Sequence, residues 1–316
     1  MPTEVTFAMV QEAAQRIRPI AQRTPVLTSQ TFDEQSGLSA FFKCENLQKG
    51  GAFKIRGASN LVFSLSKSEL SKGLIAYSSG NHAQATAIAA RHVGAPCTIV
   101  MPADAPRSKL EATRAYGANV VTYDRFRDNR EKVAAGIIEK TGAALIPPFD
   151  HTMIIAGQGT TVLELLEQAP DLDAIITPVG GGGLLSGCAV AAKGLNPKIR
   201  VFGAEPAGAN DTYLSFQSGE RVEVTPDTIA DGLRSPMPGK LTLPIIRELA
   251  EAILLVSEDE IRSALKFLLT RMKILVEPSG AVSAAAVLFS KLPKDVRRVG
   301  IVLSGGNVDF EQLAEL

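Results

Sequence analysis

Short apolar runs alternate with longer helical patterns along most of this chain, and that alternation constrains the fold more than any other feature. The runs predicted as strands are Gly73–Ala76, Cys97–Met101, Asn119–Tyr123, Ala174–Pro178, Arg200–Ala204, Ala252–Val256 and Val299–Leu303. The segments predicted as helices are Asn81–Val93, Ser108–Tyr116, Arg125–Thr141, Gly157–Ala169, Leu184–Leu195 and Ser257–Met272. Strands with near-continuous Val, Ile and Ala, separated by helices, indicate parallel sheets covered on both faces. The sequence therefore predicts an α/β fold.

A Pro-Pro pair in the segment 144–150 (AALIPPFD) follows a short predicted strand. Paired prolines stiffen an extended crossing, so a domain junction is expected there. Several strand–helix units lie on each side of it. We therefore expect two α/β lobes with a ligand-binding cleft between them.

The charge balance and the cysteines narrow the class of protein. The 33 basic and 33 acidic residues give a formal net charge of zero, without the basic excess typical of nucleic-acid or membrane-surface proteins. The three cysteines are far apart and form no CxxC, which argues against a disulfide framework or a zinc site. The first 20 residues contain acids and no long apolar run, so we do not expect a secretory signal there. No apolar stretch in the sequence approaches the roughly 20 residues of a bilayer crossing. We expect a cytoplasmic enzyme or binding protein.

Lys54 lies in the segment KGGAFKIRGA, between Phe53 and Ile55 and close to Arg56. An amine in an apolar, cationic setting loses part of its preference for the charged form, which makes Lys54 a candidate nucleophile. A solvated surface lysine is the alternative, and this segment alone does not exclude it.

Small polar residues in the segment YSSGNHAQ, from Tyr77 to Gln84, separate the strand GLIAY from an alanine-rich helix. Free backbone N–H groups at the positive end of a helix can bind a carboxylate or a phosphate. An ordinary helix cap is the alternative, since Ser or Asn serves that purpose alone. His82 is by default a packed or capping histidine.

Four consecutive glycines, Gly180, Gly181, Gly182 and Gly183, lie between the strand DAIITPV and the helix LLSGCAVAAKG. Such a run allows backbone amides to wrap an anion closely. Its spacing fits neither GxGxxG nor a P-loop, which disfavours a dinucleotide module. Ser304 follows the last strand, so we expect it at the carboxyl edge of a sheet, where ligands bind.

Eight segments, taken together, resemble the fold-type-II enzymes that use pyridoxal 5′-phosphate (PLP), specifically the serine racemase and serine/threonine dehydratase group. They are AFKIRGA, SSGNHAQA, IAGQGT, PVGGGGLLSG, GAEP, TIADGL, RMKILVEP and VLSGGNVD, in the family's order across nearly the whole chain. The stretches PPFDH and YDRF…RE further resemble the threo-3-hydroxyaspartate dehydratases. The resemblance implies two open parallel-sheet lobes of the tryptophan-synthase-β-like architecture. Residues 1–65 and 150–316 would form the large PLP-binding domain, and residues 66–149 the small domain.

The resemblance also assigns roles at the cofactor. It makes Lys54 the lysine that carries PLP as a Schiff base and moves protons on one face, and Ser79 the proton carrier on the opposite face. The remaining cofactor-binding residues that it implies are Phe53 at the pyridine ring, Asn81 at the phenolic oxygen, Gly180, Gly181, Gly182 and Gly183 at the phosphate, and Ser304 at the ring nitrogen. A hydroxyl at that nitrogen favours rapid loss of a β-hydroxyl over long-lived carbanions.

Substrate contacts follow from the same resemblance. The residues implied are Ser78, Ser79, Asn81, His82, Arg130 and Ser235. A 3-hydroxyaspartate side chain needs a cation for its second carboxylate, and Arg130 or Arg234 could supply it, although surface charge explains both equally well.

A metal site is implied at Glu205, Asp211 and the carbonyl of Ala209. Hard oxygen ligands of this kind suit Mg²⁺ or Ca²⁺, whereas by spacing alone two acids six residues apart are usually a solvated surface. Some serine racemases also bind ATP, and the comparable positions here are Gln84, Lys109, Tyr116 and Lys273, each of which has a surface or packing explanation. A homodimer is implied by the resemblance only.

The leading hypothesis is PLP-dependent dehydration and deamination of L-serine or L-threonine to a 2-keto acid and ammonia, with serine racemase activity. The alternative substrate is threo-3-hydroxyaspartate. A β-replacement synthase is less favoured, because SSGNH stands where such enzymes have a TSGN-type loop and because Glu205 and Asp211 are present. A non-catalytic ligand-binding module would be expected to lack Lys54 or the glycine loop, and both are present.

Overall fold

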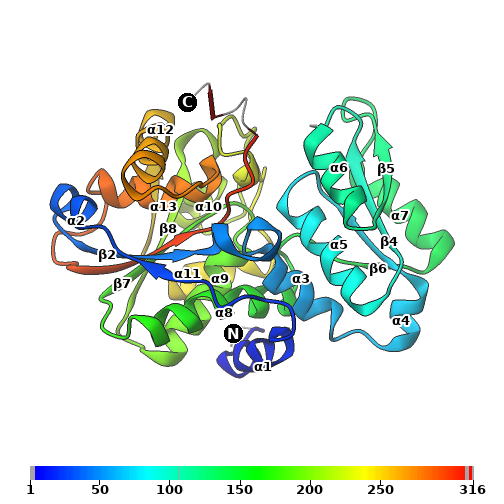
Figure 1. Cartoon of the computed structure of the whole chain (residues 1–316), viewed down its shortest axis with the longest axis horizontal. Helices are drawn as coiled ribbons and strands as arrows, with labels where there is room; N and C mark the ends of the chain where they lie inside the picture. The colour runs from blue at the N-terminus through cyan, green and yellow to red at the C-terminus, as the bar shows by residue number, and fades with distance from the viewer. Residues whose placement is uncertain (1–3, 106, 310–312, 315–316) are drawn as a thin grey trace.

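The computed structural model describes residues 4–105, 107–309 and 313–314, and its strands form two separate sheets (Figure 1). The larger sheet has the strand order β1-β2-β10-β7-β8-β9, and the smaller has the order β5-β4-β3-β6. The strands are β1 (Val26–Leu27), β2 (Ser39–Cys44), β3 (Leu74–Tyr77), β4 (Cys97–Pro102), β5 (Asn119–Tyr123), β6 (Ala144–Leu145), β7 (Ala174–Pro178), β8 (Arg200–Pro206), β9 (Ala252–Val256) and β10 (Arg298–Leu303). Their pairs are parallel except at the sheet edge, where β1 runs antiparallel to β2. The predicted α/β fold with two parallel-sheet lobes is confirmed.

Helices surround both sheets. They are α1 (Phe7–Ile17), α2 (Gln30–Ser36), α3 (Lys54–Val62), α4 (Lys67–Lys72), α5 (Asn81–Val93), α6 (Arg107–Ala115), α7 (Arg130–Thr141), α8 (Thr152–Gln168), α9 (Gly183–Leu195), α10 (Asp211–Ser218), α11 (Thr242–Leu249), α12 (Glu258–Phe267) and α13 (Pro278–Leu288). Short 3-10 turns occupy Glu45–Leu47, Lys49–Gly51, Ala207–Ala209 and Asp231–Leu233, and a π-helical turn at Leu268–Met272 continues α12.

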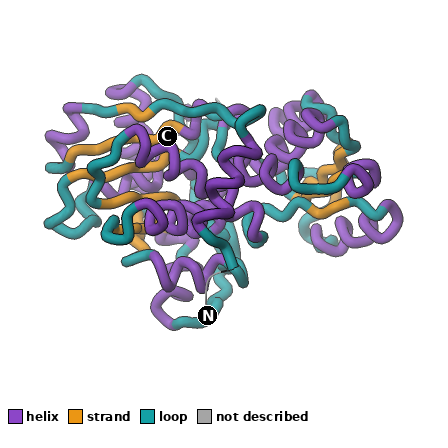
Figure 2. Tube along the Cα trace, turned by 90° about the horizontal axis from the view of Figure 1, so that it is seen from below, coloured by secondary structure: helices purple, strands orange, loops and turns teal. Residues whose placement is uncertain are grey.

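Successive residues of the central strands are buried on opposite faces of the larger sheet. Ile175 and Val201 pack in a cluster with α8 and α9, whereas Ile176 and Phe202 pack in a cluster with α12 and α13. Side chains alternate in direction along a strand, so helices on both sides bury every residue of β7, which is apolar except for Thr177. Figure 2 shows helices packed around these strands.

The smaller sheet is covered in the same way. Ile99 of β4 packs in a cluster with α5, and its neighbour Val100 packs with Ala134 of α7 on the other face. The four-stranded sheet uses only residues 74–145. We therefore propose residues 66–149 as the small domain and residues 1–65 with 150–316 as the large domain.

Two helix starts differ from the prediction by more than one residue. Helix α7 begins at Arg130 and not at Arg125, because the side chain of Asn129 accepts hydrogen bonds from the backbone N–H groups of Glu131 and Lys132 and so caps the helix there. Residues 125–129 form a loop instead.

Helix α8 begins at Thr152, five residues before the predicted start at Gly157, with the His151 side chain accepting from the Met153 N–H at 3.1 Å. Gly157 lies inside this helix, at a position where a Cβ would come within 2.6 Å of the Cα of Gly57. The glycine is thus required by the close crossing of α3 and α8 and does not mark a helix end. No helix in the described part of the chain has the length and apolar character that a membrane crossing needs.

Candidate active site

A cavity lies between the two lobes at the carboxyl ends of β3, β7 and β10. Ligands of open parallel sheets bind at such edges. The cavity brings together the predicted catalytic, cofactor and substrate residues, namely Phe53, Lys54, Ser78, Ser79, Asn81, His82, Arg130, Gly180, Gly181, Gly182, Gly183, Ser235 and Ser304. The predicted metal ligands, Glu205, Ala209 and Asp211, are not part of its lining.

Lys54 is the first residue of α3 and directs its amine into this cavity. Its Nζ donates a hydrogen bond to the Pro148 carbonyl at 2.7 Å and lies 5.2 Å from the centre of the Phe53 ring. Burial lowers the pKa of Lys54 to about 8, although the Glu277 carboxylate opposes the shift. A larger fraction of this amine than of an ordinary lysine is therefore uncharged and nucleophilic near neutral pH.

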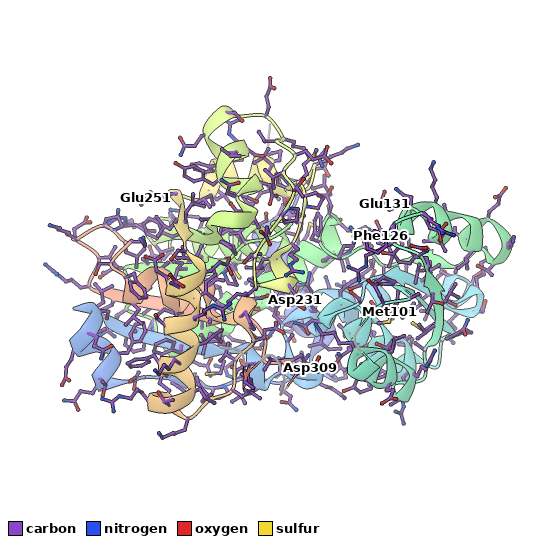
Figure 3. All side chains as sticks on the ribbon, turned by 90° about the horizontal axis from the view of Figure 1, so that it is seen from above. Met101, Phe126, Glu131, Asp231, Glu251 and Asp309 are labelled. Atoms are coloured by element: carbon purple, nitrogen blue, oxygen red, sulfur yellow. The ribbon has the colours of Figure 1, made fainter. Side chains whose placement is uncertain are left out.

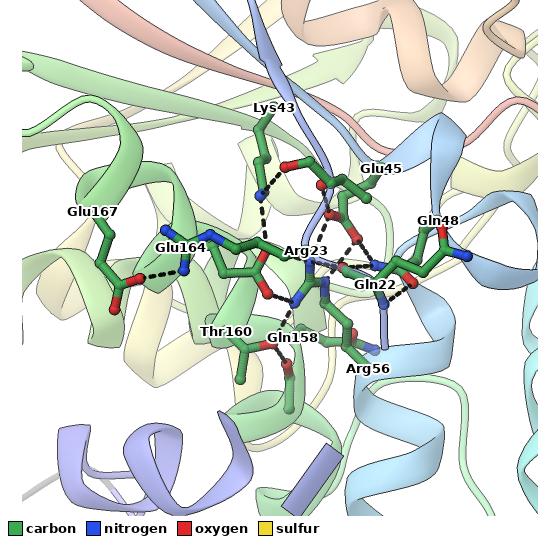
Figure 4. Close-up of polar contacts among 12 residues, drawn as sticks. Gln22, Arg23, Lys43, Glu45, Gln48, Arg56, Gln158, Thr160, Glu164 and Glu167 are labelled. Atoms are coloured by element: carbon green, nitrogen blue, oxygen red, sulfur yellow. Dashed lines mark hydrogen bonds and ion pairs between the residues drawn. The ribbon is translucent and has the colours of Figure 1, made fainter. Parts of the chain in front are cut away.

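Arg56 does not provide the cationic neighbour that was expected beside Lys54. Its guanidinium is fully buried and pairs with the carboxylates of Glu45 and Glu164, on the side of α3 away from the cavity (Figure 4). The lowered pKa of Lys54 is thus caused by desolvation and not by a neighbouring arginine.

The loop between β3 and α5 carries Ser78, Ser79 and Gly80, and Asn81 begins the helix. The first N–H groups of a helix have no partner within it, so this end of α5 can receive a carboxylate. His82 differs from its neighbours, because its ring is buried and its Nε2 lies 2.8 Å from the Ile146 carbonyl. Burial lowers the pKa of His82 to about 3, so it is a neutral, packed histidine at the cavity wall.

The glycine loop joins β7 to α9, with Gly182 at a φ of 91° immediately before the helix. A Cβ on Gly181 would come within 2.3 Å of the Phe149 ring, and one on Gly183 within 2.9 Å of the Phe149 Cβ. Phe149 thus explains two of the four glycines without any ligand. The loop still places backbone N–H groups at the start of α9, on the cavity wall, where they suit an anion.

Asn81 is held between two side chains that come from distant parts of the chain. Its Nδ2 donates to Glu277 Oε1 at 2.7 Å, and its Oδ1 accepts from the Asn307 amide at 2.9 Å. Burial raises the pKa of Glu277 to about 8, and Asp231 adds to the shift. Ser304 is buried one residue beyond β10, and its carbonyl accepts from the Phe53 N–H at 3.0 Å. The cavity therefore has a nucleophilic amine on one wall and an ordered polar network on another.

A family model described as pyridoxal-phosphate dependent enzyme matches residues 17–305. The chain belongs to this family.

Characterised relatives locate the chain within the family. It is 50% identical to a serine racemase of Dictyostelium discoideum, with 99% of this chain and 98% of the relative covered. It is 48% identical to an L-threo-3-hydroxyaspartate ammonia-lyase of Saccharomyces cerevisiae, covering 98% and 96%. The solved structure of maize serine racemase superposes with a TM-score of 0.95 at 45% identity, covering 98% of this chain and 96% of that one. A solved threonine deaminase is also similar, with a TM-score of 0.91 at 46% identity. This is a PLP enzyme of the serine racemase, hydroxyaspartate ammonia-lyase and threonine deaminase group.

The residues present fit PLP. An amine of lowered pKa suits a carbonyl cofactor, and the amides at the start of α9 suit a phosphate. The Phe53 ring and the Ser304 hydroxyl line the same space. We therefore assign these residues to the cofactor as proposals for this chain.

The predicted metal ligands form a second buried site beneath the glycine loop. Glu205 accepts from the N–H groups of Thr212 and Tyr213 at 3.1 and 2.8 Å, and the Thr212 hydroxyl donates to the Gly180 carbonyl at 3.2 Å. Both carboxylate oxygens of Asp211 are buried, and neither has a hydrogen-bond partner among the described residues.

The charge state of this second site also fits a cation. Burial raises the pKa of Asp211 to about 7, and burial together with Asp211 raises the pKa of Glu205 well above its ordinary value. Two buried carboxylates of like charge, one of them without donors, suit a divalent cation with oxygen ligands. The described part of the chain holds no group of three or more metal-ligating side chains, so the Ala209 carbonyl and water would complete such a site.

Several cavity residues were absent from the prediction. They are Tyr77, Lys109, Phe149, Asp231, Leu233, Glu277 and Ser279. Lys109, considered earlier only for ATP, forms a 2.6 Å ion pair with Asp231 that joins α6 of the small lobe to the larger lobe. Figure 3 shows Asp231 between the lobes. Glu277 stands just before Pro278 at the start of α13, but its side chain makes no capping hydrogen bond, so no local signal marked its place in the cavity.

Proposed function

We propose that this protein catalyses β-elimination from small L-hydroxy amino acids such as L-serine and L-threonine, giving a 2-keto acid and ammonia, with serine racemase activity at the same site. One observation carries the proposal. The amine of Lys54, whose pKa is lowered, and the hydroxyl of Ser79 line one cavity and come from different lobes. Two proton carriers on different walls suit chemistry at both faces of a Cα atom.

Each residue has a defined task in this proposal. PLP, when bound, supplies an electron sink for the charge left at Cα. Lys54 Nζ would hold the cofactor and take the Cα proton of an L-substrate, and this proton would pass to the departing β-hydroxyl, which leaves as water. Ser79 Oγ donates a proton to the opposite face when the substrate is racemised. Ser304 would present its hydroxyl to the ring nitrogen, which would keep the electron sink weak and favour elimination.

Substrate binding is assigned to the loop after β3. The start of α5 with Ser78 and Asn81 would receive the α-carboxylate, and Phe149 would help to exclude water from the cavity. Ser235 lines the same cavity, but its Oγ donates to the Met237 carbonyl at 2.9 Å, so a substrate contact would use its remaining acceptor capacity.

A second candidate is ammonia-lyase activity on threo-3-hydroxyaspartate. The cations at the mouth of the cleft favour it. Lys109, Arg130 and Arg234 line both the cavity and the outer space that adjoins it. The acidic residue Asp231 lines the same two spaces. The Arg130 guanidinium lies 5.4 Å from the centre of the Tyr77 ring, and both residues line the cavity. A second carboxylate is the group that such a mouth would attract.

Release of 2-keto acid by the purified PLP-loaded protein, with Mg²⁺, tests these candidates. The substrates are L-serine, D-serine, L-threonine and L-threo-3-hydroxyaspartate. Release from L-serine or L-threonine at least tenfold above that from hydroxyaspartate supports the first candidate, and the reverse ratio supports the second. Silence on all four, with the cofactor absorption band intact, contradicts elimination and leaves racemisation or β-replacement.

Ser79→Ala separates the two activities. We expect racemisation to fall by about 10²–10⁴-fold, the usual contribution of a proton carrier, while elimination from the L-substrate survives. Equal loss of both activities would contradict the two-face assignment. Chiral chromatography of the serine pool measures racemisation, and keto acid release measures elimination.

The remaining assignments are proposals of the same kind. Glu205, Asp211 and the Ala209 carbonyl would hold Mg²⁺ or Ca²⁺ and stiffen the glycine loop through Thr212. ATP as an effector and a homodimer follow from the family resemblance, and a cytoplasmic location follows from the cysteine usage and composition of the sequence.

A further inference from the structure

Arg56 is fully buried behind the cavity, and each of its guanidinium nitrogens donates a hydrogen bond (Figure 4). Its Nε and one terminal nitrogen bond both oxygens of Glu45 at 2.7 and 2.8 Å. Its two terminal nitrogens bond both oxygens of Glu164 at 2.8 Å each, and further bonds reach Thr160 Oγ1 and the Gln22 carbonyl. One arginine thus forms two bidentate carboxylate pairs.

Lys43 completes this arrangement. Its Nζ bonds Glu164 Oε2 at 2.7 Å, the Thr24 carbonyl at 2.8 Å and the Gln168 side chain at 2.8 Å. Burial alone would raise the pKa of Glu164, but the bonds and charges of Arg56 and Lys43 hold that pKa below its usual range. We call Lys43, Glu45, Arg56 and Glu164 the buried charge cluster. Its two cations and two anions balance.

The buried charge cluster joins three elements that are distant in sequence. Glu45 follows β2, Glu164 lies in α8, and Arg56 lies in the first turn of α3, two residues after Lys54. Residues i and i+2 of a helix do not face the same side, so Lys54 reaches the cavity while Arg56 reaches the large lobe. The Gly57 N–H also donates to Gln158 Oε1 at 3.1 Å, which ties the next residue of α3 to α8.

Stability alone does not explain why charges are used here. A buried ion pair costs desolvation that its attraction often only offsets, and a well-packed apolar group of similar volume is frequently as stable. What the charged groups add is directional, bidentate geometry that apolar packing lacks. The cluster is therefore suited to fixing the position of one helix start.

We propose that Arg56 is a positioning residue whose paired bonds to Glu45 and Glu164 fix the first turn of α3, so that Lys54 presents its amine to the cavity in a single position. The proposal rests on the role of Lys54 proposed above. A displacement of about 1 Å in a reacting group can lower a rate on the order of a hundredfold. The cluster would thus control the chemistry without touching substrate or cofactor.

Two variants and one matched control test this role. Arg56→Lys keeps the charge but cannot form two bidentate pairs, and Glu164→Gln keeps the shape while removing one charge. Arg23→Gln is the control, because Arg23 pairs at 2.7 Å with Glu167, one turn along α8 from Glu164, in a half-exposed position. Each variant is purified as PLP-loaded enzyme, and a portion is converted to the cofactor-free form.

The first readout does not need activity. In the cofactor-free protein, the rate of reductive methylation of Lys54, followed by peptide mass spectrometry against pH, reports the accessibility and pKa of the amine. We expect the midpoint near pH 8 to shift by at least about half a unit in Arg56→Lys and in the same direction, by less, in Glu164→Gln. Arg23→Gln should match the unchanged protein.

The second readout separates kcat from KM. We expect kcat to fall by about 10–100-fold in Arg56→Lys and by about 3–10-fold in Glu164→Gln, with KM changed less than about threefold, because the substrate-binding loop belongs to the other lobe. If a folded Arg56→Lys loses only thermal stability, with wild-type methylation profile and kcat, the positioning role is wrong. If Arg56→Lys fails to fold, Glu164→Gln decides by the same criteria.

Lys54→Ala distinguishes a failure here from a failure of the proposed function. If that variant keeps the cofactor absorption band and turnover, Lys54 has no role and the proposed function fails. If it loses both while Arg56→Lys behaves as the Arg23→Gln control, only the positioning role is overturned.

Discussion

Two groups of charged residues flank the candidate active site, and they differ mainly in their access to water. The buried charge cluster behind Lys54 has fully buried Lys43, Glu45 and Arg56, with every cation balanced by a carboxylate. At the cleft mouth, which we define as Lys109, Arg130, Asp231 and Arg234, the side chain of Asp231 is 33% exposed. Ion pairs of the same kind thus occur in the protein interior and in partial contact with water.

This difference in access to water predicts different roles for the buried charge cluster and the cleft mouth. Charges without water interact strongly and cannot be left unpaired, so the buried charge cluster should behave as a rigid support. Charges in contact with water are screened and can exchange partners, so the cleft mouth should act on the approach of ligands and on the relative position of the lobes. The cleft mouth also carries three cations against one acid, whereas the buried charge cluster is neutral.

The largest effect should come from the residue that the rigid support presents. Lys54→Ala should lower turnover by at least about 10³-fold, because the proton carrier and the point of cofactor attachment are both lost. The absorption band of the bound cofactor should vanish, and the free energy of unfolding of the cofactor-free protein should not fall, since only a desolvated amine is removed. Steady-state kinetics and absorption spectra measure this. A variant that retained the band would contradict the assignment.

The buried charge cluster and the cleft mouth should differ clearly in how much they contribute to the free energy of unfolding. Glu45→Ala leaves Arg56 without one of its paired carboxylates in a dry interior, so the free energy of unfolding should fall by about 3–5 kcal/mol. Asp231→Ala breaks a partly solvated pair, and its loss should be about 1 kcal/mol or less. Guanidinium denaturation of both proteins under one condition gives the comparison. Equal losses would show that burial does not distinguish the two regions.

The motif-bearing part of this site was predictable from sequence because it depends on local order. Each predicted segment follows a strand or begins a helix: Lys54, the Ser78–His82 segment, the glycine loop and Ser304. Strands such as Ala174–Pro178 can be recognised from their apolar composition. The carboxyl ends of β7 and β10 meet at one edge of the larger sheet, so the glycine loop and Ser304 were expected to lie together. The segment after β3 belongs to the smaller sheet and joins them only through the packing of the two lobes.

The supports of the site were not predictable for the opposite reason. Arg56 pairs with residues 11 and 108 positions away, and Glu277 bonds Asn81 across 196 positions. Nothing local marks such partners, and a lone charged residue is usually solvated. The glycine run shows a related limit, because Phe149 packing accounts for Gly181 and Gly183 where the sequence suggested an anion alone.

Glu205 and Asp211 should form a third kind of charged site, made of two buried acids of the same charge, whose stability responds to the addition and removal of a divalent cation. Adding Mg²⁺ or Ca²⁺ should stabilise the protein by about 2.7 kcal/mol at a concentration roughly a hundredfold above the dissociation constant, and a chelator should reverse the effect. Asp211→Asn should remove the response, because it removes one carboxylate charge that the cation would balance. Differential scanning calorimetry gives the midpoints. An unchanged midpoint in the parent protein with either cation would contradict a metal at Glu205 and Asp211.

Glu277 should make stability depend on pH in a known direction. Its folded pKa of about 8 lies above its ordinary value of 4.5, chiefly because of burial, so folding takes up a proton between these limits. The stabilisation is complete below pH 4.5 and is lost as pH rises toward 8.

Glu277→Gln keeps an acceptor for Asn81 but cannot titrate. The fall in the free energy of unfolding between about pH 5 and pH 8 should therefore be smaller in this variant than in the parent protein. Urea denaturation at several pH values measures both slopes. Parallel slopes would mean that Glu277 is already ionised in the folded protein.

The smallest effect should appear at the cleft mouth, where water weakens each charge. If the cations there attract a second carboxylate, raising the salt concentration from about 50 to 500 mM should raise the KM or, without turnover, the inhibition constant for threo-3-hydroxyaspartate about two- to fivefold. The values for zwitterionic L-serine should change less. Arg130→Gln should remove most of this difference, whereas Arg127→Gln, in the loop before α7 but outside the cavity lining, should leave it unchanged. Equal salt dependence for the two amino acids would show that the cleft mouth does not read the charge of the substrate, and the preference for L-serine or L-threonine would then depend on the shape of the cavity alone.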